Sequence, residues 1–312
     1  MTIAQTILAF LIAALSPVLA LAASSPSPSP SDSSSESERV QKWCGEVQTQ
    51  VKALNWDVDP CKDVEWKQGG TSVEHRPLLY GEFGDPKATN VTLVFALVHG
   101  DEVTPLYIGL QLSHWLKTNE KSLGSTRVIL APMVNPDGFY HKPRTRMNAN
   151  GVDVNRNFAT QDWQASALRS WAIKYHKDKR RYPGNEPGSE PETIFQEDMI
   201  RKFQPQKIIS IHSPLNFLDY DGPSAASMSL EKFPKTYVQQ CLQLRSRVKA
   251  ISSGFFPGSL GNRAGQEMGI PTLTLELPSA DPKKARAYWK KFSEGIRSAI
   301  EFVMESHAAS GM

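Results

Sequence analysis

The chain has 312 residues, 40% of them hydrophobic, which is enough for one large domain with an ordinary core. Its formal net charge is only +3, and its lysines and arginines are scattered along the chain rather than gathered in stripes. We therefore expect no nucleic-acid-binding surface, and one large α/β domain is the simplest interpretation.

The amino terminus has features of an export signal. Residues 7–22 are the only membrane-like apolar stretch, and Ala20-Leu21-Ala22 offers a small-x-small cleavage site. We expect residues 1–22 to be a signal peptide and the protein to be periplasmic or secreted. The preceding MTIAQT contains no lysine or arginine, so an uncleaved anchor is the alternative, and membrane contact is expected only through it.

A low-complexity segment follows the signal. Residues 24–38, SSPSPSPSDSSSESE, consist of serine, proline and acidic residues alone. Such a composition supplies no apolar surface to offset the entropy lost on ordering the chain. We interpret residues 23–42 as a linker, followed by a single folded domain at residues 43–309.

The chain has three cysteines, and an expected export signal raises the question of whether two of them form a disulfide. In an oxidising compartment Cys44 and Cys61 could close a loop of 16 intervening residues at the start of the domain, leaving Cys241 unpaired. The alternative interpretation is that Cys44 and Cys61 are two buried thiols.

Residues 91–102, VTLVFALVHGDE, contain the clearest strand. Seven of the first eight residues are apolar, which is typical of a central strand that is buried on both faces. The run ends in His99 and Glu102, and sites of open α/β sheets lie at the carboxyl ends of strands. This spacing lets an imidazole and a carboxylate reach one ion, and zinc with two histidines and one glutamate keeps a position open for water.

The rest of the chain alternates strands and helices. This alternation predicts a mainly parallel, doubly wound mixed sheet flanked by helices. A turn and then a strand are expected over residues 71–83. We expect further strands over 126–132, 207–212 and 270–277, a turn at 135–138, helices over 103–117, 189–203, 228–251 and 281–306, and a glycine-rich loop over 254–265.

Two further polar residues stand in core strands. His212 ends the strand 207–212 as His99 follows its own strand, so it is the candidate third ligand. Glu276 lies in the last core strand, where a buried acid is disfavoured. Each residue alone could be a hydrogen-bonded core group, but their joint position at strand ends favours a metal site.

The segment 144–158, RTRMNANGVDVNRNF, is unusually polar for a loop that follows a core strand. It holds three arginines and four asparagines in fifteen positions. Arginine binds carboxylates through two parallel hydrogen bonds, so the segment favours recognition of an acidic group. The alternative is an ordinary Asn/Gly turn with surface arginines.

These motifs together resemble the M14 family of zinc carboxypeptidases over about residues 70–306. The order HxxE, arginine, GVDVNRN, distant histidine and final glutamate matches the pattern of that family. The segments HGDE, NPDGF, RMNANGVDVNRNF, PGSEPET, PGSLGN and LTLELP resemble the murein peptide amidases in particular.

The resemblance implies a zinc carboxypeptidase-like fold and a role for each motif residue. It implies one zinc ion, a general base, an arginine that stabilises the carbonyl oxyanion, and a pair that binds the terminal carboxylate of the substrate. The implied zinc ligands are His99, Glu102 and His212, with Asp153 orienting a ligand histidine. The implied general base is Glu276, the arginine that stabilises the oxyanion is Arg146, and the pair that binds the terminal carboxylate is Asn155 and Arg156. Arg144 is the alternative to Arg146 in its role and is a further candidate for substrate binding.

The resemblance also implies a reaction, which is hydrolysis of peptidoglycan peptides between γ-D-glutamate and meso-diaminopimelate. Alternatives are a general metallocarboxypeptidase, an amino-acid deacylase of the desuccinylase type, and a non-catalytic peptidoglycan-binding domain. The chain differs in one respect from the pancreatic-type members of the family. Those members have a tyrosine about twenty residues before the catalytic glutamate. Phe255 and Phe256 stand in this region here. The sequence does not indicate an oligomeric state.

Overall fold

A computed structural model of the chain describes residues 30–222, 230–239 and 256–304. The expected signal peptide at residues 1–22 and the start of the linker lie outside these residues, as do Cys241 and Phe255. No helix in the described part of the chain is long and apolar enough to span a membrane.

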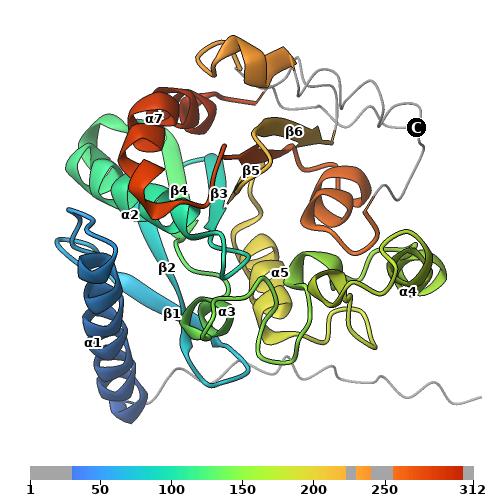
Figure 1. Cartoon of the computed structure of the whole chain (residues 1–312). Coiled ribbons are helices and arrows are strands. Elements are labelled where there is room, and N and C mark those ends of the chain that lie inside the picture. The colour runs from blue at the N-terminus through green and yellow to red at the C-terminus, as the bar shows by residue number, and fades with distance from the viewer. Residues whose placement is uncertain (1–29, 223–229, 240–255, 305–312) are drawn as a thin grey trace, which may run out of the picture.

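A mixed sheet forms the centre of the molecule (Figure 1). Its seven described strands lie in the order β1-β2-β4-β3-β5-β7-β6. The middle strands β4, β3, β5 and β7 are parallel, whereas β1, β2 and β6 join by antiparallel pairing, so the predicted fold class is confirmed. The strands are β1 (Trp66–Thr71), β2 (Pro77–Gly84), β3 (Asn90–Ala96), β4 (Thr126–Ala131), β5 (Lys207–His212), β6 (Phe217–Asp221) and β7 (Thr272–Glu276).

The predicted central strand is β3, and all of its residues are buried. It is hydrogen-bonded to β4 on one side and to β5 on the other. The strand ends earlier than the apolar run, because Leu97 adopts a φ of +48° and turns the backbone. His99 therefore stands in the turn after the strand rather than in it.

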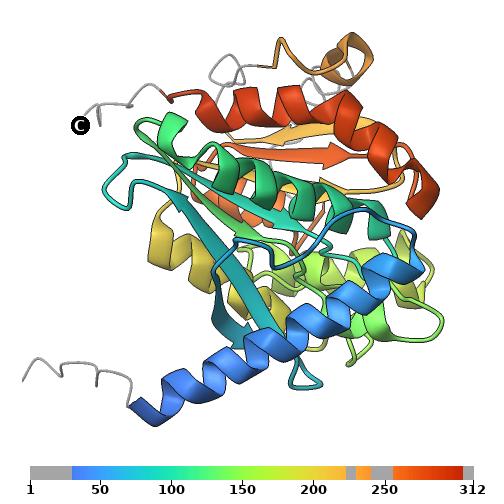
Figure 2. The same ribbon diagram turned by 90° about the vertical axis from the view of Figure 1, so that its left-hand side faces the viewer.

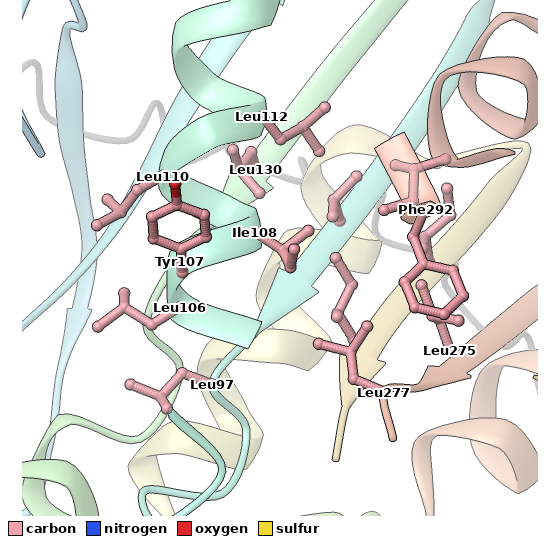
Figure 3. Packing of buried hydrophobic residues seen from close by; sticks show 14 of the residues in the cluster. Leu97, Leu106, Tyr107, Ile108, Leu110, Leu112, Leu130, Leu275, Leu277 and Phe292 are labelled. Carbon is pink, nitrogen blue, oxygen red and sulfur yellow. The ribbon is translucent and has the colours of Figure 1, made fainter. Parts of the chain in front are cut away.

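Helices cover both faces of the sheet (Figure 2). Helices α1 (Pro30–Ala53), α2 (Val103–Thr118) and α7 (Ala285–Glu301) lie on one face, and α5 (Pro191–Phe203) lies on the other. Successive side chains of β3 point to opposite faces of the sheet, and this explains the arrangement. Val94 packs in the same cluster as α1, α2 and α7, whereas its neighbours Leu93 and Phe95 pack with α5. Figure 3 shows α2 packed against Leu130 of β4, and Leu275 of β7 next to Phe292 of α7.

Shorter helices connect these elements. The 3-10 helices are η1 (Glu120–Ser122), η2 (Val154–Arg156), η3 (Lys179–Arg181) and η6 (Pro282–Lys284). The remaining helices are α3 (Pro136–Tyr140), α4 (Trp163–Ile173) and the π-helix η5 (Gly261–Glu267).

Helix α1 begins inside the predicted linker. The linker is expected over residues 23–42, and α1 begins at Pro30. Proline, serine and acidic residues suit the first turns of a helix, where free N–H groups and the helix dipole favour them. Further along α1, Trp43, Val47 and Val51 follow at helical spacing and are buried in the core. These buried residues lie at and after residue 43, where the predicted domain begins.

A disulfide between Cys44 and Cys61 ties α1 to the segment before β1. This confirms the pairing suggested by the two cysteines and excludes the alternative of two separate buried thiols. The crosslink holds the first helix of the domain against the sheet.

Three predicted boundaries differ from the structure. The turn at 135–138 is the start of α3, and Asn135 caps it by accepting a hydrogen bond from the Gly138 N–H. Helix α5 begins with Glu190 rather than Ser189 at the N-cap position. The expected 281–306 helix starts at Ala285, because residues 282–284 form η6 instead.

The two remaining predictions concern residues 228–265. The expected helix over 228–251 is a turn at 231–233 with helical residues at 235–239, and residues 240–251 lie outside the described part. The expected loop over 254–265 ends in the π-helix η5. Gly265 of η5 lies so close to β6 that a Cβ atom there would be 2.7 Å from the backbone carbonyl carbon of Asp221, which explains the glycine at this position.

Candidate active site

His99 and Glu102 lie in the tight turn that joins β3 to α2. The N–H of Glu102 donates to the carbonyl oxygen of His99 over 3.1 Å, and this closes the turn. Gly100 packs directly on α3, since a Cβ atom at this position would lie 2.1 Å from the carbonyl carbon of Gly138. Glycine is thus required between the two polar residues. Both side chains are buried, with exposed fractions of 2% and 5%.

His212 completes a cluster with these two residues. It ends β5, which is the parallel neighbour of β3, so the two strand ends lie side by side. Nδ1 of His99 is 2.8 Å from Oε1 of Glu102, and Nδ1 of His212 is 3.2 Å from Oε2. One ligand atom from each residue lies within 4.8 Å of the others. The structure thus brings together the three predicted ligands.

The far nitrogens of both imidazoles are held by neighbouring side chains. Nε2 of His99 lies 3.1 Å from Oδ1 of Asp153, and Nε2 of His212 lies 2.9 Å from Oγ of Ser210. Both Nδ1 atoms therefore face inward and lie 3.2 Å apart. Two inward imidazole nitrogens with a carboxylate form a donor set that suits zinc, so the residues present fit the ion that the resemblance implies.

Ser210 is a member of the site that the sequence motifs do not mark. It stands two residues before His212 in β5, and residues at this spacing share one face of a strand. That spacing is the signal which identifies it.

The carboxylates of this cluster are held in the ionised form. Burial alone raises the pKa of Glu102, but the charges and hydrogen bonds of His99 and His212 outweigh burial and hold this pKa well below its usual range. Asp153 behaves in the same way, since Arg146 and His99 hold its pKa low in spite of its burial. An ionised Glu102 is the form that binds a metal ion.

Arg146 lies beside the cluster, as expected for a residue of the site. Its Nε donates to Oδ2 of Asp153 over 2.8 Å, and its Nη1 donates to Oε1 of Glu102 over 3.1 Å. Two carboxylates thus fix the plane of this guanidinium group at the cleft wall.

Glu276 is the last residue of β7 and is paired in register with His212 of β5. Its exposed fraction is 8%, and its Oε2 accepts a hydrogen bond from the Leu215 N–H over 3.3 Å. Burial, together with the nearby charge of Glu102, raises the pKa of Glu276 to about 8. The sheet register therefore places a protonatable carboxylate next to the candidate ligands.

Asn155 and Arg156 line the same cleft from η2. Oδ1 of Asn155 accepts a hydrogen bond from the Leu260 N–H over 2.9 Å, and this fixes its side chain. The guanidinium of Arg156 stacks 4.7 Å from the ring centre of Phe256, and one of its nitrogens donates to the carbonyl oxygen of Asn155. Both predicted substrate-binding residues are thus in the cleft.

Arg144 does not line this cleft, so the structure does not bring it together with the other candidate residues. Its Nη2 donates to Oε1 of Gln50 in α1 over 3.2 Å, and its guanidinium stacks 4.6 Å from the ring centre of Phe139. Arg144 and Arg146 stand two residues apart in an irregular segment, and of the two only Arg146 reaches the cluster. Arg144 therefore fastens the loop to α1.

The cleft has a volume of about 620 Å³ and includes residues that no motif marks. One wall comes from residues 174–181, a part of the chain that the sequence pattern leaves unassigned. A charge run, KDKRR at 177–181, is its only visible signal. The wall consists of Lys174, Tyr175, Arg180 and Arg181, and Asp219 and Asp221 of β6 contribute another part of the lining.

Two imidazoles and a carboxylate beside a second, protonatable carboxylate, all at the ends of parallel strands, define a metal-dependent hydrolase. The profile of the zinc carboxypeptidase family matches residues 61–266, and the chain belongs to this family.

Known proteins agree with this assignment. The chain is 37% identical over 220 residues to murein peptide amidase A of Escherichia coli strain K12, covering 69% of this chain and 82% of that protein. The solved structure of a murein-tripeptide amidase from Escherichia coli O157 matches with a TM-score of 0.52 and 27% identity, covering 77% of this chain and 93% of that one. Bovine thrombin-activatable fibrinolysis inhibitor shares the fold, with a TM-score of 0.58, 20% identity and coverage of 85% and 94%.

Proposed function

We propose that this protein is an exported zinc-dependent amidase that hydrolyses peptides derived from peptidoglycan. The proposed bond joins γ-D-glutamate to meso-diaminopimelate. The observation that carries the proposal is that the His99, Glu102 and His212 cluster shares one cleft with Glu276 and with the Asn155–Arg156 pair. The 37% identity to murein peptide amidase A supports the choice of substrate.

His99, Glu102 and His212 hold one zinc ion in this proposal. Bound there, zinc polarises the scissile carbonyl group and makes a water molecule more acidic. Asp153 and Ser210 orient the two histidines through their outer nitrogens, which keeps both Nδ1 atoms available as ligands.

Glu276 is the proposed general base. Its carboxylate takes a proton from the attacking water and then delivers it to the nitrogen of the leaving amine, so that one residue serves both steps. Binding of a cation by the neighbouring ligands favours the ionised form of Glu276, and this opposes the effect of burial on its pKa.

Arg146 is the proposed oxyanion stabiliser. Its guanidinium is held on two sides by Asp153 and Glu102, so it needs little reorganisation when negative charge develops on the carbonyl oxygen. Asn155 and Arg156 bind the carboxylate that stands next to the scissile amide in the leaving amino acid, which arginine pairs with through two hydrogen bonds.

Export is supported by two independent features. Residues 7–22 and the Ala20-Leu21-Ala22 site have the pattern of a cleavable signal peptide. The Cys44–Cys61 disulfide suits an oxidising compartment such as the periplasm or the extracellular space. We therefore propose a periplasmic or secreted enzyme.

The experiment that tests this function is digestion of L-Ala-γ-D-Glu-meso-diaminopimelate by the zinc-loaded protein, with products identified by mass. The expected products are L-Ala-D-Glu and free diaminopimelate, and the Glu276→Gln variant serves as the inactive control. A protein that leaves this tripeptide whole but removes ordinary L-amino acids from peptide carboxyl termini is a general metallocarboxypeptidase, and the proposal is then wrong.

A further inference from the structure

The cleft wall formed by residues 174–181 is rich in positive charge. Lys174, Tyr175, Arg180 and Arg181 all line the cleft that contains the candidate zinc ligands. Arg180 is neutralised locally, since its Nη1 lies 2.7 Å from Oδ2 of Asp101 in the turn between the ligands His99 and Glu102. This ion pair fastens the wall beside the catalytic centre.

The other cations of the wall are held by aromatic rings. Lys174 Nζ lies 5.3 Å from the ring centre of Tyr175 and 5.3 Å from that of Phe256. The guanidinium of Arg181 lies 4.7 Å from the ring centre of Tyr175, and that of Arg156 lies 4.7 Å from Phe256. Cations and rings therefore alternate along the wall, and a ring that stacks on a guanidinium group contacts its face and not its N–H edge.

Two polar groups in this region lack a partner among the described residues. The hydroxyl oxygen of Tyr175 and Nε of Arg156 are both shielded from solvent, and neither makes a hydrogen bond within that part of the chain. Buried groups of this kind are almost always hydrogen-bonded, because leaving them unpaired costs free energy. Both groups are hydrogen-bond donors, so a bound group with acceptor oxygens satisfies them.

Like charges also crowd this part of the cleft. Burial lowers the pKa of Arg156, and the neighbouring positive charges of Arg146 and Arg181 lower it further, against the effect of Asp153. Within the described part of the chain, the only acidic partner of Arg181 is a loose one, since its Nε lies 3.7 Å from Oδ2 of the exposed Asp178. An anion bound here reduces the repulsion between these positive charges. It also accepts hydrogen bonds from the Tyr175 hydroxyl and from Nε of Arg156.

We propose that Tyr175, Arg181 and Lys174 form a second anion-binding subsite, which binds a carboxylate of the substrate other than the one next to the scissile amide. A carboxylate suits this subsite because it accepts several hydrogen bonds in one plane, from guanidinium and phenol donors alike. The subsite deepens the proposed function and rests on it. It makes the enzyme selective for peptides that carry at least two carboxylates.

The test measures binding rather than turnover. The zinc-loaded Glu276→Gln protein is titrated calorimetrically with the tripeptide and with three analogues, each having one different carboxylate converted to an amide. We expect amidation of one carboxylate that is not next to the scissile bond to weaken binding about tenfold or more, as for a charge-assisted hydrogen bond. The three analogues identify which carboxylate this is.

The variants Tyr175→Phe and Arg181→Gln, made in the same background, then identify the residues. Each should weaken binding of the tripeptide about tenfold and leave binding of that one analogue nearly unchanged. Arg201→Gln is the matched control, because Arg201 is 75% exposed on α5 and pairs with Asp198. It should bind all four peptides as the parent protein does.

The outcomes separate this subsite from the proposed function. Variants that weaken the tripeptide and all three analogues equally, or none of them, overturn the subsite, and absence of tripeptide binding to the parent overturns it as well. Digestion by the unmodified enzyme is the separate test of function. A protein that distinguishes the analogues as expected but does not cut the tripeptide retains the subsite and refutes the function.

Discussion

Oδ1 of Asp153 lies 3.1 Å from Nε2 of His99, on the opposite side of the imidazole ring from the candidate ligand atom Nδ1. A carboxylate in this position fixes the proton on Nε2 and makes Nδ1 the more basic nitrogen. Asp153 is fully buried, and its other oxygen accepts a hydrogen bond from Arg146. One aspartate thus orients both a metal ligand and the proposed oxyanion stabiliser.

Asp153→Asn should weaken zinc binding about 10- to 100-fold, because the amide no longer holds His99 through an ionised acceptor. Competition with a coloured chelator measures the affinity. Asp178→Asn, in the exposed loop before η3, is the control and should bind zinc as the wild type does. Equal affinity of the Asp153 variant and the wild type would contradict the role of this residue.

His212→Ala should abolish stoichiometric zinc binding. It removes one of three candidate ligands, and the remaining histidine and glutamate leave too few donors for a tightly held ion. Metal analysis of the purified protein should give one zinc per chain for the wild type and almost none for the variant. Retention of a full equivalent by the variant shows that His212 is not a ligand.

Glu276→Gln should leave the fold and the zinc content unchanged while lowering turnover by about a hundredfold or more. The amide keeps the size of the side chain but cannot accept the proton of the attacking water. Steady-state rates with the tripeptide, together with metal analysis of the same sample, measure both effects. Turnover close to that of the wild type refutes the assignment of the general base.

The pH dependence of stability should reveal the buried Glu192. Burial raises the pKa of this carboxyl group to about 7, above the ordinary value of 4.5. Between these values the folded chain retains a proton that the unfolded chain releases, so the free energy of unfolding falls as the pH rises. Glu192→Gln has no carboxyl group at this position, so its free energy of unfolding does not fall in this way. The variant should therefore become more stable relative to the wild type as the pH rises from 5.5 to 8.

Glu82 provides the opposite case as a control for this measurement. Despite its partial burial, hydrogen bonds and charges from Arg127 and Lys67 lower its pKa, so the ionised form stabilises the folded state above the unfolded pKa. Glu82→Gln should therefore be less stable than the wild type by an amount that stays constant from pH 5.5 to 8. Urea unfolding at several pH values measures both variants, and a flat difference for Glu192→Gln contradicts the raised pKa.

The disulfide should be detectable in protein recovered from its native compartment. With Cys44 and Cys61 paired, one of the three cysteines remains, so thiol titration of the denatured protein should find one thiol per chain. Replacing both paired residues with serine should lower the free energy of unfolding by about 3 kcal/mol, which is typical of a loop of this length. Three titratable thiols in the native material contradict the pairing.

The cluster of candidate ligands could be predicted from sequence because its residues are tied to regular elements. His99 and His212 follow or end apolar strands, and the turn at Gly100 places Glu102 on the same side as His99. The register of β5 and β7 then brings Glu276 beside His212. In each case the side chain stands at the end of a strand or in the turn after it, a position that the local sequence indicates.

The cleft wall at 174–181 could not be predicted in this way. Its position depends on contacts between distant segments, such as the Arg180–Asp101 ion pair and the stacking of Lys174 on Phe256. Arg144 shows the same limit, since its contact with Gln50 depends on the docking of α1. Local composition does not reveal which of two nearby arginines faces the cleft.

Helix α1 lies along β1 at the edge of the sheet (Figure 1). The backbone N–H of Gln68, in β1, donates to Oε1 of Glu36, and its side chain accepts a hydrogen bond from Nε of Arg39. Exposed edge strands are templates on which other chains add further strands, and covering them with a helix prevents aggregation. Because the Cys44–Cys61 bond crosslinks α1 to the segment before β1, the helix stays close to the strand it protects. Formation of this disulfide therefore also guards the edge strand β1 against self-association.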